Sequence, residues 1–219
     1  MDGMLYASVL HPPVYGGAVQ SVDDSAALKV AGVKQIATID AFKPPVMMQA
    51  LGGVAVLADN TYAAFQGKKK LKVEWTKSEH GVWTSDAFRK ELVATSQKPC
   101  KVVRENGNVD EAFRKGGKIV EAEYYAPMLA HAPMEPPAAL AVYREGKVEV
   151  WAPTQSPQGA QEAIAAAVGG KKEDVTVHVT LLGGAFGRKS FPDFAIEAAV
   201  LSKKTGKPVK VVWSREDDI

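Results

Sequence analysis

The residues best suited to chemistry form one run, Gly183-Gly184-Ala185-Phe186-Gly187-Arg188-Lys189-Ser190. Glycines adopt backbone angles that other residues resist, and they let a ligand approach the main chain closely. A glycine-rich turn between a strand and a helix also presents N–H groups that bind an anion without any side chain. The run therefore predicts an anion or cofactor loop, with a plain strand-to-helix turn as the alternative.

Two common nucleotide-binding motifs do not fit this run. A P-loop places its lysine directly after the second glycine, whereas Arg188 separates Gly187 from Lys189. The dinucleotide fingerprint Gly-x-Gly-x-x-Gly requires gaps that differ from those between Gly183, Gly184 and Gly187. Any ligand of the loop is therefore expected to be something other than a nucleotide held by these motifs.

Three side chains could act on a ligand of this loop. Phe186 suggests a wall beside a bound group, although it could instead plug the core between two lobes. Gln155 precedes a helix that starts with proline, and its amide could donate and accept hydrogen bonds or serve only as a polar loop residue. The planar fork of Arg188 suits phosphate oxygens, but it could also only complement the surface.

Length and composition exclude several classes of protein. The 219 residues, 46% of them apolar, suffice for one large or two small domains, and a net charge of +2 argues against a dedicated nucleic-acid binder. The single cysteine, Cys100, excludes an internal disulfide, an iron–sulfur cluster or a thiolate zinc site in this chain. No apolar run reaches the length of a membrane span, and no signal peptide is expected at the start.

The elements that must position these residues follow an α/β pattern. Strands and helices alternate over residues 1–78, with an irregular loop at 41–53. Residues 79–116 read as a connection with helices at 85–96 and 109–115. Residues 117–219 contain strands at 119–125, 138–143, 147–151, 174–182 and 209–213 and helices near 157–168 and 192–204, with no closing element after residue 215.

Three motifs carry a family resemblance: GGAFGRK at residues 183–189, APTQ at 152–155 and MEP at 134–136. Together, and in this order, they resemble the molybdenum-cofactor subunit of the xanthine dehydrogenase and aldehyde oxidase family. The large (beta) subunit of bacterial isoquinoline 1-oxidoreductase is the most similar branch. The resemblance implies a small hammerhead-type α/β domain at residues 1–78, a connection at 79–116, and the first part of a mixed α/β molybdopterin-binding domain at 117–219.

The resemblance also implies roles for individual residues. Gln155 is expected beside an oxo ligand of the molybdenum, and Phe186 beside the substrate. Purine-oxidising members carry a glutamate where this chain has Ser190, which favours an aldehyde or an aromatic N-heterocycle as substrate. No side chain is expected to ligate the metal directly. The expected cofactor-binding residues are Gln155, Gly183, Gly184, Ala185, Phe186, Gly187 and Arg188, and those of the substrate pocket are Phe186 and Ser190.

Three further residues, Glu135, His131 and His11, have expected places in the fold. Glu135, within the MEP motif, is a candidate structural carboxylate near the pocket. His131 is expected to be a hydrogen-bonded core histidine. His11, before two prolines at a strand end, is expected to be a turn or interface residue rather than a ligand.

The family reaction is hydroxylation of a carbon with oxygen derived from water. The resemblance implies molybdenum with molybdopterin cytosine dinucleotide, and iron–sulfur clusters in a small partner subunit. The essential family glutamate is expected beyond Ile219, in the remainder of the large subunit, so no catalytic residue is expected in this chain. The chain alone is expected to be inactive and to bind the cofactor weakly. A non-catalytic binding or scaffold protein that keeps the fold is the alternative. The bacterial periplasm is the expected compartment, with the cytoplasm as the alternative.

Overall fold

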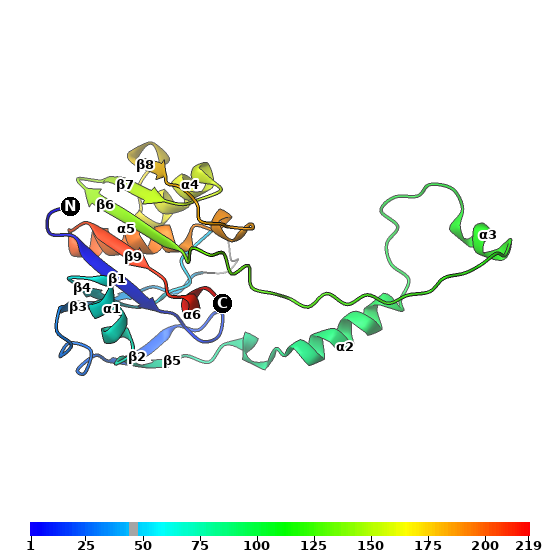
Figure 1. Cartoon of the computed structure of the whole chain (residues 1–219), viewed down its shortest axis with the longest axis horizontal. Helices are drawn as coiled ribbons and strands as arrows, with labels where there is room; N and C mark the ends of the chain where they lie inside the picture. The colour runs from blue at the N-terminus through cyan, green and yellow to red at the C-terminus, as the bar shows by residue number, and fades with distance from the viewer. Residues whose placement is uncertain (44–47) are drawn as a thin grey trace. The chain divides into compact units, whose positions relative to one another are not determined.

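The computed structural model describes residues 1–43 and 48–219, so part of the loop expected at 41–53 lies outside the described residues. The chain divides into two units, which Figure 1 shows in ribbon form. The main unit comprises Met1–Gly81 and Ala130–Ile219, and the connecting unit comprises Val82–Leu129.

A mixed seven-stranded sheet forms the centre of the main unit, with the strand order β3-β4-β1-β9-β6-β7-β8. Parallel and antiparallel neighbours both occur, because β1 pairs with β9 and β7 with β8 in parallel while the other pairs are antiparallel. This sheet confirms the predicted mixed α/β class. Its strands are β1 (Leu5–Leu10), β3 (Val33–Ile39), β4 (Gly53–Ala58), β6 (Ala138–Arg144), β7 (Lys147–Ala152), β8 (Val175–Val179) and β9 (Val209–Val212).

Strand β9 joins the two halves of the chain. Its residue Val211 pairs with Ala7 of β1 on one side and with Ala139 of β6 on the other. Both valines of β9 that face the core are fully buried, which suits a central strand of an α/β sheet. The sheet therefore differs from the predicted division into separate domains at residues 1–78 and 117–219, because strands from both ranges share one hydrogen-bonded layer and one core.

Helices cover both faces of the sheet. Helix α1 (Thr61–Lys68) packs against β1 and β4, where Gly67 lies close to Val56. Helices α4 (Pro157–Val168) and α5 (Asp193–Thr205) pack together against β6–β9. All six residues of β4 are buried, because successive side chains of a strand point to opposite faces and both faces are covered here.

Local signals explain where the helices begin and end. The side chain of Asn60 accepts the N–H of Ala63 and caps α1. Proline stands at the start of α4, and Gly169 and Gly206 end α4 and α5 in the left-handed conformation that favours glycine. A short helix, α6 (Arg215–Asp218), follows β9, although the sequence predicted no closing element there.

A small second sheet and several 3-10 turns accompany the seven-stranded sheet. Strands β2 (Val19–Asp23) and β5 (Lys72–Trp75) form a separate two-stranded sheet in the main unit. Short 3-10 turns occur at η1 (Glu79–Val82), η2 (Lys172–Asp174) and η3 (Arg188–Ser190).

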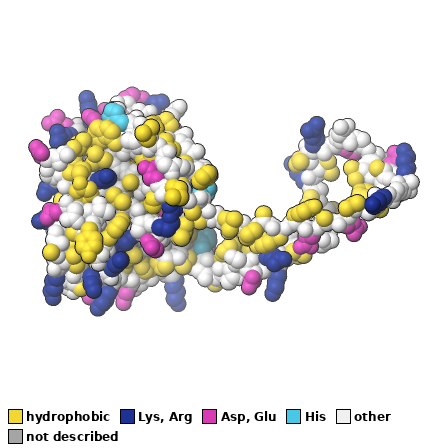
Figure 2. Space-filling model, viewed as in Figure 1, with side chains coloured by type: hydrophobic (Ala, Val, Ile, Leu, Met, Phe, Trp, Pro, Cys, Tyr) yellow, Lys and Arg dark blue, Asp and Glu magenta, His cyan; other side chains and the backbone are white. Residues whose placement is uncertain are grey.

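The connecting unit holds the two helices predicted for it, α2 (Ser85–Ser96) and α3 (Val109–Arg114), each capped by a side chain of the preceding residue. Neither helix has a buried residue, and Figure 2 shows apolar side chains exposed along this unit. The strand predicted at residues 119–125 is wrong, because this range is irregular and exposed. Its alternating pattern meets no partner strand among the described residues, and without inter-strand hydrogen bonds a strand does not form.

Candidate functional site

The glycine run lies between β8 and α5, as predicted, and its last residues form the turn η3. Three of its residues adopt left-handed backbone angles: Gly184 at φ 93°, Phe186 at 54° and Gly187 at 97°. Phe186 is 75% exposed although it carries a large apolar side chain, whereas Ala185 is buried. Phe186 therefore projects from the loop and does not plug the core.

The main chain of this loop is the feature with the clearest binding capacity. In the described part of the chain, the N–H groups of Gly184, Ala185 and Phe186 donate no hydrogen bond. Successive N–H groups in a turn with left-handed residues form an anion-binding concavity, and a polar group without a partner costs free energy when water is excluded. The loop therefore offers three adjacent donors to an acceptor-rich ligand.

Gln155 lies beside this loop, as the resemblance implied. Its Oε1 accepts the N–H of Gly187 at 3.0 Å, and its own main-chain N–H donates to the carbonyl of Lys189 at 3.1 Å. The hydroxyl of Thr154 donates to the same carbonyl at 3.0 Å. Since Oε1 is occupied by the loop, the amide nitrogen of Gln155 remains a donor without a partner among the described residues.

The carboxylate of Glu135 holds both ends of the glycine run, because it binds Gly183 and Lys189. The N–H of Gly183 donates to Glu135 Oε2 at 3.0 Å, and Nζ of Lys189 lies 2.5 Å from the same oxygen. Burial opposes the charge of this carboxylate, but the hydrogen bonds from Lys189 and Gly183 outweigh it and lower the pKa of Glu135. The glutamate is therefore a structural carboxylate of the loop, as predicted.

Lys189 was not predicted as a site residue. In the structure its side chain is fully buried and forms a salt bridge with Glu135. A lysine at 0% exposure is rare unless it is paired. Its place in the motif gave no sign of burial, because lysine is among the most exposed residue types. Only the combination with a glutamate in the MEP motif could have suggested this ion pair.

Arg188 is held by an ion pair within the chain. Its two terminal nitrogens donate to the two carboxylate oxygens of Asp193 at 3.1 and 2.9 Å. Its guanidinium also lies 5.1 Å from the ring centre of Trp213. Both terminal nitrogens of the fork therefore bind a carboxylate of the chain itself, and the expected contact of Arg188 with oxygens of a ligand stays a prediction.

The remaining predicted residues have the following places. Ser190 is half-buried, and its N–H donates to the carbonyl of Gly187. His131 is exposed rather than a core residue, because it lies in the irregular approach to β6 beside Gly187. His11 is largely buried and bonded to Glu197. A cavity of about 440 Å³ adjoins the loop's anchor Glu135 and is also lined by Pro153 and Thr180.

Over residues 1–43 and 48–219, no group of three or more His, Cys, Asp or Glu side chains is arranged to hold a metal ion. Among the helices formed by the same residues, none combines the length and the apolar character needed to cross a membrane.

The chain matches a family model described as the molybdopterin cofactor-binding domain, over residues 94–219. Because this match covers more than half of the sequence, the chain belongs to that family. The predicted resemblance to the molybdenum subunit of the xanthine dehydrogenase and aldehyde oxidase family is thereby confirmed.

Similar proteins agree with this assignment. Over the whole chain, the sequence is 35% identical to "Membrane-bound aldehyde dehydrogenase (pyrroloquinoline-quinone)" of Gluconacetobacter polyoxogenes and 32% identical to "Isoquinoline 1-oxidoreductase subunit beta" of Brevundimonas diminuta. In each case it spans only 28% of the relative's length. The fold is similar to that of quinoline 2-oxidoreductase from Pseudomonas putida 86, with a TM-score of 0.71 at 19% identity, covering 100% of this chain and 32% of that one.

Proposed function

We propose that the loop of residues 183–188, together with Gln155, binds the molybdopterin cofactor. The observation that carries this proposal is the set of three adjacent N–H groups, at Gly184, Ala185 and Phe186, that have no partner in the described structure. A pterin with its phosphate presents several oxygen and nitrogen acceptors, so it suits a row of main-chain donors. Family membership supports the same ligand, since the matching model is named for it.

Gln155 is the proposed side-chain donor of this site. Its Oε1 is held by Gly187, and this bond fixes the amide plane and leaves the nitrogen to donate to an oxygen of the cofactor. The ring of Phe186 projects from the same loop and would limit the space next to the cofactor. Arg188 contributes by shaping the loop, because its guanidinium is bound to Asp193.

When bound, the molybdenum centre supplies the redox chemistry of a hydroxylation with water-derived oxygen. The residues of this chain bind and orient the cofactor, and we assign no proton transfer to any of them. We propose the cytosine dinucleotide form of the cofactor, a small iron–sulfur subunit as electron acceptor, and the remainder of the large subunit as the source of the catalytic base. On this proposal, the chain by itself is inactive.

An aldehyde or an aromatic N-heterocycle is the proposed substrate class of the whole protein. Two observations support it: the names of the relatives, which refer to aldehydes and isoquinoline, and Ser190 in the place of a purine-orienting carboxylate. A hydroxyl cannot replace the charge of a glutamate toward a purine. The chain spans 28% of the length of these two relatives, so the substrate class is proposed for the whole protein and not for this chain alone.

The experiment is to produce the chain in a host that makes molybdopterin and to measure pterin and molybdenum per chain. Wild-type chain is expected to retain a detectable amount of both, below one per chain, and Gln155→Ala to lose most of this pterin because the loop loses its Gly187 anchor and the site loses a donor. Gln158→Ala is the matched control, since this exposed glutamine of α4 donates its side-chain hydrogen bond to Glu162 and makes none with the loop among the described residues. Wild-type chain without pterin, or with pyrroloquinoline quinone instead, would contradict the proposal.

A further inference from the structure

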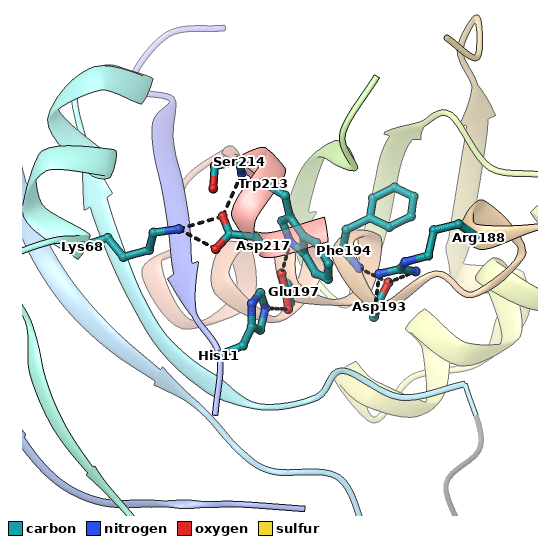
Figure 3. A network of polar contacts seen from close by, with 9 residues as sticks. All are labelled: His11, Lys68, Arg188, Asp193, Phe194, Glu197, Trp213, Ser214 and Asp217. Atoms are coloured by element: carbon teal, nitrogen blue, oxygen red, sulfur yellow. Dashed lines mark hydrogen bonds and ion pairs between the residues drawn. The ribbon is translucent and has the colours of Figure 1, made fainter. Parts of the chain in front are cut away.

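Helix α5 carries two buried carboxylates one helical turn apart, Asp193 at 1% and Glu197 at 0% exposure. Residues four apart lie on the same face of a helix. Burying a carboxylate is costly unless its partners satisfy it fully. Figure 3 shows both side chains inside one polar network that extends from the end of β1 to the glycine loop.

Each carboxylate is fully engaged. Asp193 accepts hydrogen bonds from both terminal nitrogens of Arg188, and from the N–H of Phe194 at 3.0 Å. Glu197 forms hydrogen bonds with Nε2 of His11 at 2.7 Å and with the indole N–H of Trp213 at 2.9 Å.

The two halves of this network meet at Trp213, which lies just after the central strand β9. The guanidinium of Arg188 is 5.1 Å from the centre of the indole ring, and the ring of His11 lies 4.6 Å from it in a tilted arrangement. A cation over an aromatic face is attracted by the ring. Glu197 therefore orients the indole, and the indole and Asp193 together fix the plane of Arg188.

Arg188 is the next residue after Gly187, whose N–H donates to Gln155. The position of its guanidinium therefore determines where the C-terminal end of the loop lies against Gln155. We propose that Asp193 and Glu197 are positioning residues, which hold the glycine loop in its binding conformation through Arg188 and Trp213. The consequence for the cofactor rests on the proposed function, whereas the consequence for the loop does not.

The other charged groups near this network belong to α6. Asp217 pairs with Lys68 at 2.6 Å and caps α6 through the N–H of Ser214 at 2.7 Å. Asp218 binds Arg215 at 2.5 Å, and its second oxygen lies 4.0 Å from Nε of Arg188. The side chain of Asp217 is 11% exposed and its hydrogen bonds go to Lys68 and Ser214 rather than to the loop, so Asp217 provides a buried control.

The test is amide hydrogen exchange of the chain without cofactor, comparing Asp193→Asn, Glu197→Gln and the control Asp217→Asn. The protection factor of the Gly187 amide is expected to fall about tenfold in Asp193→Asn and by less in Glu197→Gln. In Asp217→Asn, any fall at Gly187 is expected to be no larger than the fall in protection of the β9 amides. Asp193→Glu, which keeps the charge, is expected to restore part of the protection. If Gly187 exchanges as in wild type, or if its loss only matches that of the β9 amides, the positioning role is refuted.

A second measurement separates this inference from the proposed function. In chain produced with molybdopterin, Asp193→Asn is expected to retain several-fold less pterin than wild type, while Asp217→Asn retains the wild-type amount. Equal retention by wild type and Asp193→Asn would also refute the positioning role. If wild type binds no pterin, the proposed function fails, and the exchange of Gly187 still decides the inference.

Discussion

At Phe186 the chain combines a left-handed φ of 54° with an aromatic side chain that is 75% exposed. A non-glycine residue in this region is strained, and a buried contact that would offset the strain is missing, since most of the ring lies in solvent. Strain of this kind concentrates at binding sites. We therefore infer that Phe186 contributes to binding in the loop rather than to the stability of the fold.

Replacing Phe186 with glycine tests this interpretation. The free energy of unfolding is expected to stay unchanged or to rise by up to about 1 kcal/mol, because glycine relieves the left-handed strain. Pterin retention is expected to fall. Glu145→Gly is the control, since Glu145 has a φ of 50° in the exposed β6–β7 hairpin, and it should change stability similarly without any change in pterin. A large loss of stability in Phe186→Gly alone would show that the ring is structural.

The Glu135–Lys189 pair gives a second prediction at this scale. Glu135→Ala is expected to destabilise the chain by about 1–3 kcal/mol, because it leaves the buried ammonium of Lys189 without its partner. The double variant Glu135→Ala/Lys189→Met should recover much of this loss, since no unpaired charge remains. Urea denaturation measures both. If the double variant loses as much stability as Glu135→Ala and Lys189→Met lose together, the ion pair does not stabilise the chain. Glu111→Ala is the control: Glu111 forms an exposed pair with Lys115, so this variant should change stability by less than about 0.5 kcal/mol.

Residue types and motif spacing predicted only part of this site. The glycine turn was recognisable from its residue types, whereas Gln155 and Glu135 were singled out mainly by the family motifs APTQ and MEP. Lys189, Asp193 and Glu197 were missed because charged residues on a helix or turn normally face water. Their burial depends on the neighbours that the fold supplies, and no local pattern in the sequence encodes those neighbours.

At the scale of elements, the strand, glycine turn and helix that carry the site were predictable from alternation, caps and helix-ending glycines. The central position of β9 was not, because pairing partners depend on contacts between distant parts of the chain. The prediction of a strand at 119–125 was wrong for the same reason, since an alternating pattern forms a strand only where another strand pairs with it.

The join between β1 and β4 depends on a glycine. Gly53 begins β4 at a φ of 143°, and a Cβ there would lie 2.4 Å from the carbonyl oxygen of Leu10. Gly53→Ala is therefore expected to lower the free energy of unfolding by about 2–3 kcal/mol, which denaturant titration would measure. Gly146→Ala is the control, because its φ of 85° adds strain of about 1 kcal/mol but leaves the Cβ in open space. Equal effects of the two variants would show that the close approach is unimportant.

At the scale of the whole chain, stability should depend on pH through two buried groups. Burial raises the pKa of Asp193 to about 6. Burial opposes the charge of His11, but the charge and hydrogen bond of Glu197 outweigh it and raise the pKa of His11 above 6.5. Both groups therefore hold a proton in the folded state at pH values where the unfolded chain has released it.

The sign of the pH dependence follows from linkage. Since an unfolded aspartate titrates near about 3.9, stability is expected to fall by up to about 3 kcal/mol as pH rises from about 4 to 6. The contribution of His11 is present below pH 6.5 and is lost as pH rises through its folded pKa. Urea titrations between pH 4.5 and 8 measure this, and Asp193→Asn should flatten the first part of the curve. Stability that rises with pH across this window would contradict the assignment.

The central claim is that the bare main chain of the glycine loop holds molybdopterin. Amide hydrogen exchange of the chain with and without bound molybdopterin tests it most directly. The N–H groups of Gly184, Ala185 and Phe186, which donate no hydrogen bond in the described structure, are expected to become protected when the cofactor is present. If these amides exchange equally fast in loaded and unloaded chain while protection appears elsewhere, the loop is not the cofactor site.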